Sequence, residues 1–228
     1  TFKSDFHFVE DYELHVENLI KNHSMDEAMS LAVGGHYELV GDIASDILIY
    51  AGAASGQCYF DFGCGSGRIA HALSKKVDAM CYKGTDVVQS LLDYANTKTP
   101  NHYKFILHRK LSIPSKNNTV DFGFAFSIFT HLLQTECYLY LRDFYRAIKP
   151  GGKLVISFLE HEAPYHWPVF ESSLSQEPAP LNTFIERGQW KVWCDHIGFT
   201  IDRFIDGTDP ISQRGALGQS VLILSKPT

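Results

Sequence analysis

The spacing of hydrophobic and polar residues divides the chain into a helical N-terminal part and a longer part of alternating patterns. Over residues 1–55, apolar side chains recur at helical spacing in three segments, and Ser24 and Glu27 have the spacing of a capping box. From residue 56 onward, short apolar runs alternate with helical patterns. We therefore expect an N-terminal helical cap of residues 1–55 and one compact domain of residues 56–228.

Repeated strand–helix alternation favours right-handed crossovers and predicts an α/β fold, a doubly wound, mainly parallel Rossmann-like sheet. The expected strands are residues 57–62, 79–84, 103–107, 120–126, 153–159, 199–205 and 220–224. The expected helices of this part are residues 67–75, 87–97, 134–148 and 181–197. No helical pattern separates the last two strands, so they predict a hairpin pair with an antiparallel C-terminal edge strand.

One segment of the second part has no periodicity. Residues 160–180 contain four of the nine prolines in the chain. A long irregular loop in a compact domain is usually a binding loop or a mobile lid. We therefore expect residues 160–180 to form such a loop. At the N-terminal side, the Gly34-Gly35 pair is expected to be a plain turn between helices, with a cofactor or substrate lid as the alternative.

A glycine-rich turn joins the first expected strand to the helix after it. Gly63, Gly65 and Gly67 follow the apolar run directly. Glycines let a backbone approach a ligand, and the free N–H groups of a helix start point toward that ligand. A dinucleotide-binding turn has its third glycine one residue later, so a pyrophosphate site is a poor match. Asp86 comes where the second strand should end, as expected for a carboxylate that binds ribose.

Composition narrows the classes of partner. The formal charge is −6 over 228 residues, which disfavours a nucleic-acid-binding surface. No run of about 18 apolar residues is present, so we expect no membrane-spanning helix. The five cysteines form no C-x-x-C pair. We interpret them as reduced thiols and expect a cytoplasmic protein.

Three further stretches follow the glycine turn in order. They are GTDV at 84–87, NTVDFGFAFS at 118–127 and LRDFYRAIKPGGKL at 141–154. Together with the turn they resemble the class I S-adenosylmethionine-dependent methyltransferases across roughly residues 34–225. FTHL at 129–132 and GQSV at 218–221 resemble a bacterial small-molecule subgroup of that family.

The resemblance implies that S-adenosylmethionine is the cofactor and that a methyl group goes to an oxygen or nitrogen of a small molecule. Asp61 and the turn would face the methionine part, and Asp86 would accept hydrogen bonds from both ribose hydroxyls. Val87 would pack on adenine, and the Ser127 carbonyl would face the amino group. The full set of expected cofactor-binding residues is Asp61, Phe62, Gly63, Cys64, Gly65, Gly67, Asp86, Val87, Lys110, Leu111 and Ser127.

One position departs from the family pattern. The family often has an acidic residue four positions before an Ile-Pro pair, where it contacts the adenine amino group. Here that position is Arg109, and a cation cannot accept this hydrogen bond. We therefore expect backbone groups of Lys110 and Leu111 to contact the adenine. We interpret Arg109 and Lys110 as solvated surface charges.

Transfer to a hydroxyl requires a base, and His131 is the best candidate because it follows the fourth strand closely. The alternative is a histidine that only orients the turn by hydrogen bonding. Glu160, His161, Glu162 and His166 are close in sequence, but proximity in an irregular segment does not make a metal site, so no metal is expected. The alternative function is a non-catalytic S-adenosylmethionine-binding or scaffold protein on the same fold.

Overall fold

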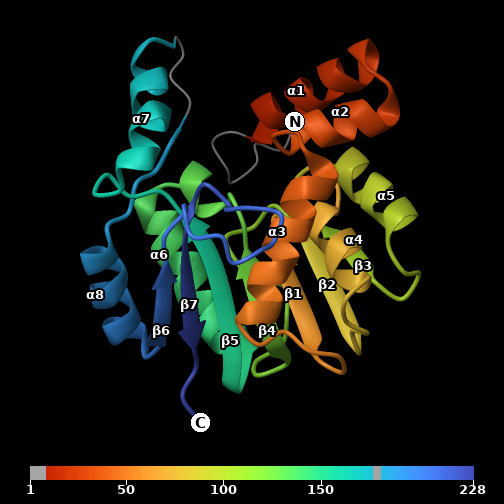
Figure 1. Ribbon diagram of the computed structural model, residues 1–228. Coiled ribbons are helices and arrows are strands. Elements are labelled where there is room, and N and C mark those ends of the chain that lie inside the picture. The colour runs from red at the N-terminus through yellow and green to blue at the C-terminus, as the bar shows by residue number, and fades with distance from the viewer. Residues whose placement is uncertain (1–8, 177–180) are drawn as a thin grey trace. The chain divides into compact units, whose positions relative to one another are not determined.

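The computed structural model describes residues 9–176 and 181–228, and the chain divides into two compact units, residues 1–111 and 112–228. Its strands form a seven-stranded sheet in the order β3-β2-β1-β4-β5-β7-β6 (Figure 1). The fold is therefore α/β with a mainly parallel Rossmann-like sheet, as the sequence predicts. The expected boundary between a cap of residues 1–55 and a domain of residues 56–228 stays a prediction.

The first unit contains three helices followed by alternating strands and helices. Its elements are α1 (Val9–Asn22), α2 (Met25–Ala32), α3 (Tyr37–Tyr50), β1 (Cys58–Phe62), α4 (Arg68–Ser74), β2 (Cys81–Asp86), α5 (Gln89–Lys98) and β3 (Lys104–Leu107). Strands β1, β2 and β3 pair in parallel, with β2 in the middle. The second strand extends to Asp86, two residues beyond the predicted end, because Thr85 and Asp86 pair with Ile106 and Leu107.

The N-terminal helices pack on the βα part of this unit through a hydrophobic cluster. Val16 of α1 and Met29 of α2 are fully buried against Val88 and Leu91 at the start of α5. The Ser24 hydroxyl accepts a hydrogen bond from the Glu27 N–H at 3.4 Å, as expected for a capped helix start. The cap helices therefore lie directly beside the residues that follow β2.

The second unit contains the remaining strands and the helices between them. Its elements are β4 (Val120–Ala125), η1 (Phe129–His131), α6 (Gln134–Ala147), β5 (Ile148–Phe158), η2 (Pro164–His166), α7 (Trp167–Leu174), α8 (Arg187–Ile197), β6 (Thr200–Ile205) and β7 (Ser220–Ser225). Strands β4 and β5 are parallel, and β7 runs antiparallel to both β5 and β6. The predicted hairpin pair lies at the sheet edge, but the antiparallel strand β7 lies inside it and β6 is outermost.

The prediction of an irregular loop over residues 160–180 is wrong for its middle part. That part forms η2 and α7, and the prolines explain why the sequence pattern missed them. Pro164 and Pro168 occupy the first turn of η2 and α7, where the fixed backbone angle of proline is compatible with a helix. Residues 177–180 lie outside the described residues. The helix expected over 181–197 begins only at Arg187.

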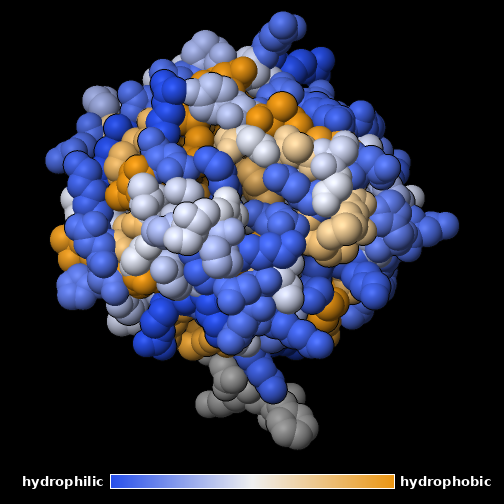
Figure 2. All heavy atoms as spheres, turned by 90° about the horizontal axis from the view of Figure 1, so that it is seen from below, coloured by the Kyte–Doolittle hydropathy of each residue, from blue (hydrophilic) through white to orange (hydrophobic). Residues whose placement is uncertain are grey.

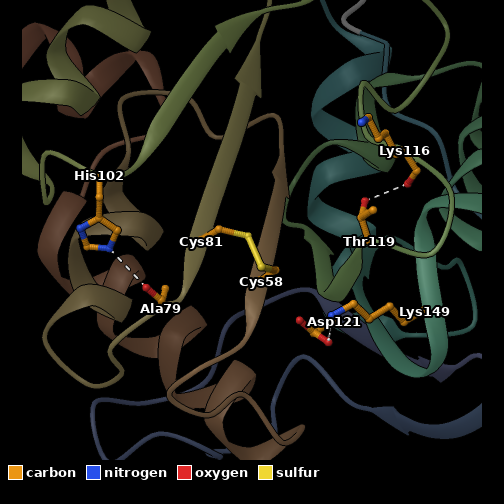
Figure 3. Close-up of a disulfide and its surroundings, with 8 residues drawn as sticks. All are labelled: Cys58, Ala79, Cys81, His102, Lys116, Thr119, Asp121 and Lys149. Atoms are coloured by element: carbon orange, nitrogen blue, oxygen red, sulfur yellow. Dashed lines mark hydrogen bonds and ion pairs between the residues drawn. A yellow bond between two sulfur atoms is a disulfide. The ribbon is translucent and has the colours of Figure 1, made fainter.

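The prediction that all cysteines are reduced thiols is also wrong. Cys58 and Cys81 form a disulfide between the first residues of β1 and β2, with their Cα atoms 4.5 Å apart (Figure 3). The two residues are direct partners in the parallel register, which brings their side chains together. The other three cysteines, Cys64, Cys137 and Cys194, are free and buried. The predicted cytoplasmic location therefore loses the support that it drew from free thiols.

Polar side chains predominate on the face shown in Figure 2, where hydrophobic ones lie in small separate groups. Among the described residues, large exposed hydrophobic side chains include Leu14, Met80 and Leu174. Within residues 9–176 and 181–228, no helix has the length and apolar character needed to cross a bilayer.

Candidate functional site

The turn between β1 and α4 is held in a shape that only glycine adopts readily. Gly63, Gly65 and Gly67 have φ angles of 72°, 54° and 80°, which is the left-handed region. A Cβ atom on Gly65 would lie 2.6 Å from a methyl carbon of Val33, and one on Gly67 would lie 2.7 Å from the Cβ of Ala95. The glycines therefore serve both the backbone conformation and the close approach of the neighbouring helices.

Asp86 ties this turn to the end of β2. Its Oδ2 accepts the Gly65 N–H at 2.9 Å, and its Oδ1 accepts the N–H groups of Val87 and Val88 at 2.7 and 3.2 Å. Burial raises the pKa of this carboxyl, and the three backbone donors lower it. A carboxylate has about four acceptor sites, so Oδ2 keeps one for a ligand hydroxyl.

Asp61 is a second buried carboxyl in this unit. The Tyr82 hydroxyl donates a hydrogen bond to its Oδ2 at 2.7 Å. The pKa of Asp61 is raised to about 7: desolvation has the largest effect, the charge of Asp86 adds to it, and the Tyr82 hydrogen bond and Arg68 act in the opposite direction. Two buried carboxyls therefore lie near each other at the carboxyl ends of β1 and β2, an arrangement that favours a cationic ligand.

The N-terminal helices contribute contacts to the turn that sequence reasoning missed. The Ser66 hydroxyl donates to the Met29 carbonyl at 2.9 Å, and Arg68 Nη1 donates to the Gly35 carbonyl at 3.4 Å. The Gly34-Gly35 segment is thus a turn between α2 and α3 that contacts Arg68. Tyr12 of α1 is close enough to Asp86 for that carboxylate to raise its pKa, second in effect to burial. The only sequence signal for Tyr12 is its place in an amphipathic helical pattern.

The interpretation of Arg109 as a solvated surface charge is wrong. Its Nε donates to the Val87 carbonyl at 3.0 Å, and its guanidinium forms an ion pair with Glu13 of α1. Arg109 therefore links α1 to the residue expected to pack on adenine. Lys110 and Leu111 are exposed at the end of this unit, and their contact with adenine stays a prediction.

The remaining residues of the predicted set in this unit are buried or half-buried. Phe62 and Cys64 are 8% and 6% exposed, and Val87 is half-buried. Burial raises the pKa of the Cys64 thiol well above its ordinary value, so the thiol stays neutral. Cys64 therefore contributes backbone and volume to the turn rather than a nucleophile.

Ser127, in the second unit, follows β4 with an unusual backbone. Its φ is 58°, in the left-handed region that a non-glycine residue seldom adopts. Its N–H donates to the Ser157 hydroxyl at 2.7 Å, and its own hydroxyl donates to Oε1 of Gln219 at 3.3 Å. No hydrogen bond to the Ser127 carbonyl occurs within the described residues. Such strain is often found at binding sites.

His131 ends the short helix η1 and is oriented by the segment before α8. Its Nδ1 lies 3.1 Å from the Leu181 carbonyl, which only accepts, so Nδ1 carries the proton. Thr183 anchors this segment because its N–H donates to the Thr130 carbonyl at 2.8 Å. Phe129 fixes the other end of η1 by packing on Trp190 with ring centroids 5.7 Å apart. In the tautomer with the proton on Nδ1, the imidazole presents the lone pair of Nε2.

A pocket of about 330 Å³ lies beside His131 within the second unit. Its polar side chains are Thr130, His131, Asn182 and Gln219. Its apolar side chains are Leu159, Val169 and Leu217, and Gly218 completes the lining. The pocket therefore combines an apolar wall with neutral hydrogen-bonding groups.

The acidic and histidine residues after β5 are engaged in other contacts. The Glu160 carboxylate is paired with Arg187, with one contact of 2.9 Å, and accepts the Ser220 hydroxyl at 2.6 Å. His161 is bonded to Glu186 at 3.1 Å. Across residues 9–176 and 181–228, no three acidic, histidine or cysteine side chains are grouped as metal ligands.

The comparisons with known proteins agree with this geometry. Residues 60–156 match the family model of the methyltransferase domain. Magnesium protoporphyrin IX methyltransferase (ChlM) from Synechocystis PCC 6803 with bound S-adenosylhomocysteine is similar in structure, with TM-score 0.67, 17% identity and 96% of each chain covered. A TehB-like S-adenosylmethionine-dependent methyltransferase from Corynebacterium glutamicum has TM-score 0.58 and 20% identity, covering 96% of this chain and 97% of its own.

A third similar structure is a complex from Haloferax volcanii. It joins the Trm112 methyltransferase activator to a protein assigned as a methyltransferase, with TM-score 0.66, 16% identity, and 89% and 97% of the two chains covered. These identities are low, so they show the fold, while the family model adds the domain type. Residues 60–156 therefore match a methyltransferase domain, and the chain has the fold of the S-adenosylmethionine-dependent methyltransferases to which it is similar.

Proposed function

We propose that this protein transfers a methyl group from S-adenosylmethionine to an oxygen or nitrogen of a small molecule, with His131 as the general base. The residues of the first unit that are proposed to bind the cofactor support this donor. In this proposal the methionine part of the donor, which carries the sulfonium and ammonium groups, faces the buried carboxyl of Asp61. Burial raises the pKa of Asp61 to about 7 without ligand, so its negative form is disfavoured, and a cation bound beside it would stabilise that form.

In this proposal the residues of the turn hold the cofactor and Asp86 binds its ribose. Gly65, Gly67 and Asp86 supply the close backbone approach and the carboxylate that such a ligand needs. When bound, the sulfonium supplies an activated methyl group whose bonding electron pair stays with sulfur as the acceptor lone pair forms the new bond. The protein's main task is then orientation, which removes roughly 7–11 kcal/mol of barrier in well-aligned cases.

The observation that carries the proposal is the fixed tautomer of His131. Because Nδ1–H is bonded to the Leu181 carbonyl, Nε2 is free to accept the proton of an acceptor hydroxyl or ammonium. The ring borders a pocket of a size that suits a small molecule. His131 therefore takes the proton at Nε2 while the acceptor is held in the pocket.

The test is a methyl-transfer assay with labelled S-adenosylmethionine and a panel of phenols, alcohols and primary amines. His131→Gln is expected to lower the transfer rate by about 100-fold or more, the usual contribution of a general base. Its affinity for S-adenosylhomocysteine should stay within twofold of the wild type. His196→Gln, an exposed histidine of α8 outside the pocket, is the matched control.

Two outcomes would contradict the proposal. One is unchanged transfer by His131→Gln. The other is tight S-adenosylhomocysteine binding with no methylation of any acceptor class, which would support the alternative of a non-catalytic binding protein.

A further inference from the structure

The proposed function gives Gln219 no role, although this residue lines the pocket and belongs to the GQSV stretch at 218–221. Gln219 precedes β7 and is half-buried. Its Oε1 accepts the Ser157 hydroxyl at 2.7 Å and the Ser127 hydroxyl at 3.3 Å. Its Nε2 has no hydrogen-bond partner within the described residues. The amide nitrogen is therefore a free donor beside the pocket.

The hydrogen bonds of the serines determine which way the amide points. The Ser157 hydroxyl oxygen already accepts the Ser127 N–H, so its own proton requires an acceptor. Oε1 of Gln219 is that acceptor for both serine hydroxyls. The reverse orientation would place the amide N–H₂ against both hydroxyls and leave their protons without this acceptor. Oε1 of Gln219 therefore faces Ser127 and Ser157, and the N–H groups of Nε2 remain able to donate to a ligand.

The backbone on both sides of Gln219 is held in place. The Gly218 N–H donates to the Gly207 carbonyl at 2.8 Å, and the Ser220 hydroxyl is bonded to the buried Glu160 carboxylate. A Cβ atom on Gly207 would lie 2.8 Å from the carbonyl carbon of Gln219, so the glycine permits this approach. The Tyr165 hydroxyl binds both the Gly207 N–H and the Ser220 hydroxyl at 2.8 Å. The backbone that carries the Gln219 amide is therefore fixed before a ligand binds.

The charge of the pocket restricts what this donor can bind. Among the described residues that line the pocket there is no Asp, Glu, Lys or Arg side chain, and His131 is the one titratable group. Glu160 follows the lining residue Leu159, but its carboxylate is paired with Arg187 and only 1% exposed. A charged ligand group would lose its hydration here without gaining an opposite charge. A neutral oxygen, by contrast, would satisfy the Gln219 donor.

From these observations we infer that Gln219 selects the methyl acceptor: the pocket takes a small, partly apolar, neutral molecule whose carbonyl, ether or hydroxyl oxygen accepts a hydrogen bond from Gln219 Nε2. The inference rests on the proposed function, in which this pocket holds the acceptor. The apolar part of the molecule lies on Leu159, Val169 and Leu217. Gln219 is a specificity residue, separate from the base His131.

The inference is tested by NMR titration of the full chain loaded with S-adenosylhomocysteine, using three probes of similar size. 4-Hydroxyacetophenone is neutral with a carbonyl, 4-hydroxybenzoate is anionic and tyramine is cationic. The neutral probe should shift the Gln219 side-chain amide signal, which is identified by its absence from Gln219→Glu. Its affinity should exceed that of either charged probe by about 10-fold or more.

Two variants of Gln219 distinguish the loss of its N–H donor from a change in pocket charge and from a loss of folding. Gln219→Glu keeps an oxygen for the two serines but has no N–H, and Gln219→Met has neither the donor nor a charge. Both should weaken binding of the neutral probe by about 10-fold or more while S-adenosylhomocysteine affinity stays within twofold. Gln213→Glu, an exposed residue of the same connection that does not line the pocket, should bind the neutral probe as the wild type does.

Equal binding of charged and neutral probes, or unchanged binding by both Gln219 variants, would overturn the inference. Failure of the proposed function looks different. In that case the neutral probe still binds at Gln219, but no acceptor is methylated and His131→Gln has no activity to lose.

Discussion

The buried carboxyl of Asp61 makes the stability of the ligand-free protein depend on pH. Because burial raises its pKa from 3.8 to about 7, the folded protein holds this proton more tightly than the unfolded chain does. The protonated Asp61 carboxyl therefore stabilises the folded protein fully below pH 3.8; this stabilisation declines as pH rises and is lost above about pH 7. At 1.36 kcal/mol per pKa unit, the full effect is about 4 kcal/mol. Asp61→Asn removes this dependence but keeps an oxygen that accepts the Tyr82 hydroxyl.

The measurement is urea unfolding followed by tryptophan fluorescence at several pH values, without reductant. The free energy of unfolding of the wild type, relative to Asp61→Asn, should fall by about 2.5 kcal/mol from pH 5 to pH 7.5 and then level off. Asp93→Asn, which replaces an exposed carboxylate on α5, is the control and should parallel the wild type. If the Asp61→Asn profile also parallels the wild type, Asp61 is not a carboxyl with a raised pKa and the electrostatic account of the turn fails.

Four further changes probe the same unit. Asp86→Asn places an amide donor against the backbone donors, so calorimetry should show S-adenosylhomocysteine binding weakened about 10- to 100-fold, and unaltered affinity would exclude a ribose-binding role. Gly67→Ala should destabilise the protein by about 2–4 kcal/mol in chemical unfolding, since it combines positive φ with a close approach to Ala95. Gly34→Ala has the same kind of φ but open space, so its cost should be about 1–2 kcal/mol; equal costs for the two would contradict the packing argument. Reducing the Cys58–Cys81 disulfide opens a loop with a sequence separation of 23 and should lower the unfolding free energy by about 3 kcal/mol, an effect that should vanish in the double serine variant.

Local patterns in the sequence predicted the strands and the glycine turn well because those features depend on near neighbours. Gly63, Gly65 and Gly67 all have positive φ, which is the property that glycine at alternate positions indicates. The position of Asp86 followed from chain order in a βαβ unit, since the second strand must end beside the turn. The family model and the similar structures confirm the methyltransferase fold that these motifs predicted.

Features that depend on contacts between distant residues were not accessible in this way. The disulfide requires the register that pairs Cys58 with Cys81, and the ion pair of Arg109 requires the placement of α1 beside the end of β3. Composition indicates only that cysteines are few and that arginine is charged. Cysteine and arginine were therefore interpreted by their average behaviour, as free thiols and as a surface charge. The structure differs because each of these side chains has a specific partner.

Gln219 was missed for a topological reason. In parallel sheets, ligand-binding residues usually follow the carboxyl end of a strand, so the sequence pattern directs attention to those ends. Strand β7 runs antiparallel to β5, so its beginning pairs with the end of β5, as Ser220 does with Phe158. A residue that precedes a strand therefore reaches the edge where others follow one.

The connection that leads into this antiparallel strand also suggests how acceptor preference could change between related chains. The residues proposed to bind the methyl donor, other than Ser127, lie in residues 1–111, whereas every described residue that lines the pocket lies in residues 112–228. Within that pocket, Leu217, Gly218 and Gln219 come from the single connection between β6 and β7, residues 206–219. Exchanging this connection between related chains should therefore transfer acceptor preference while leaving the glycine turn, and with it the affinity for the methyl donor, unaltered.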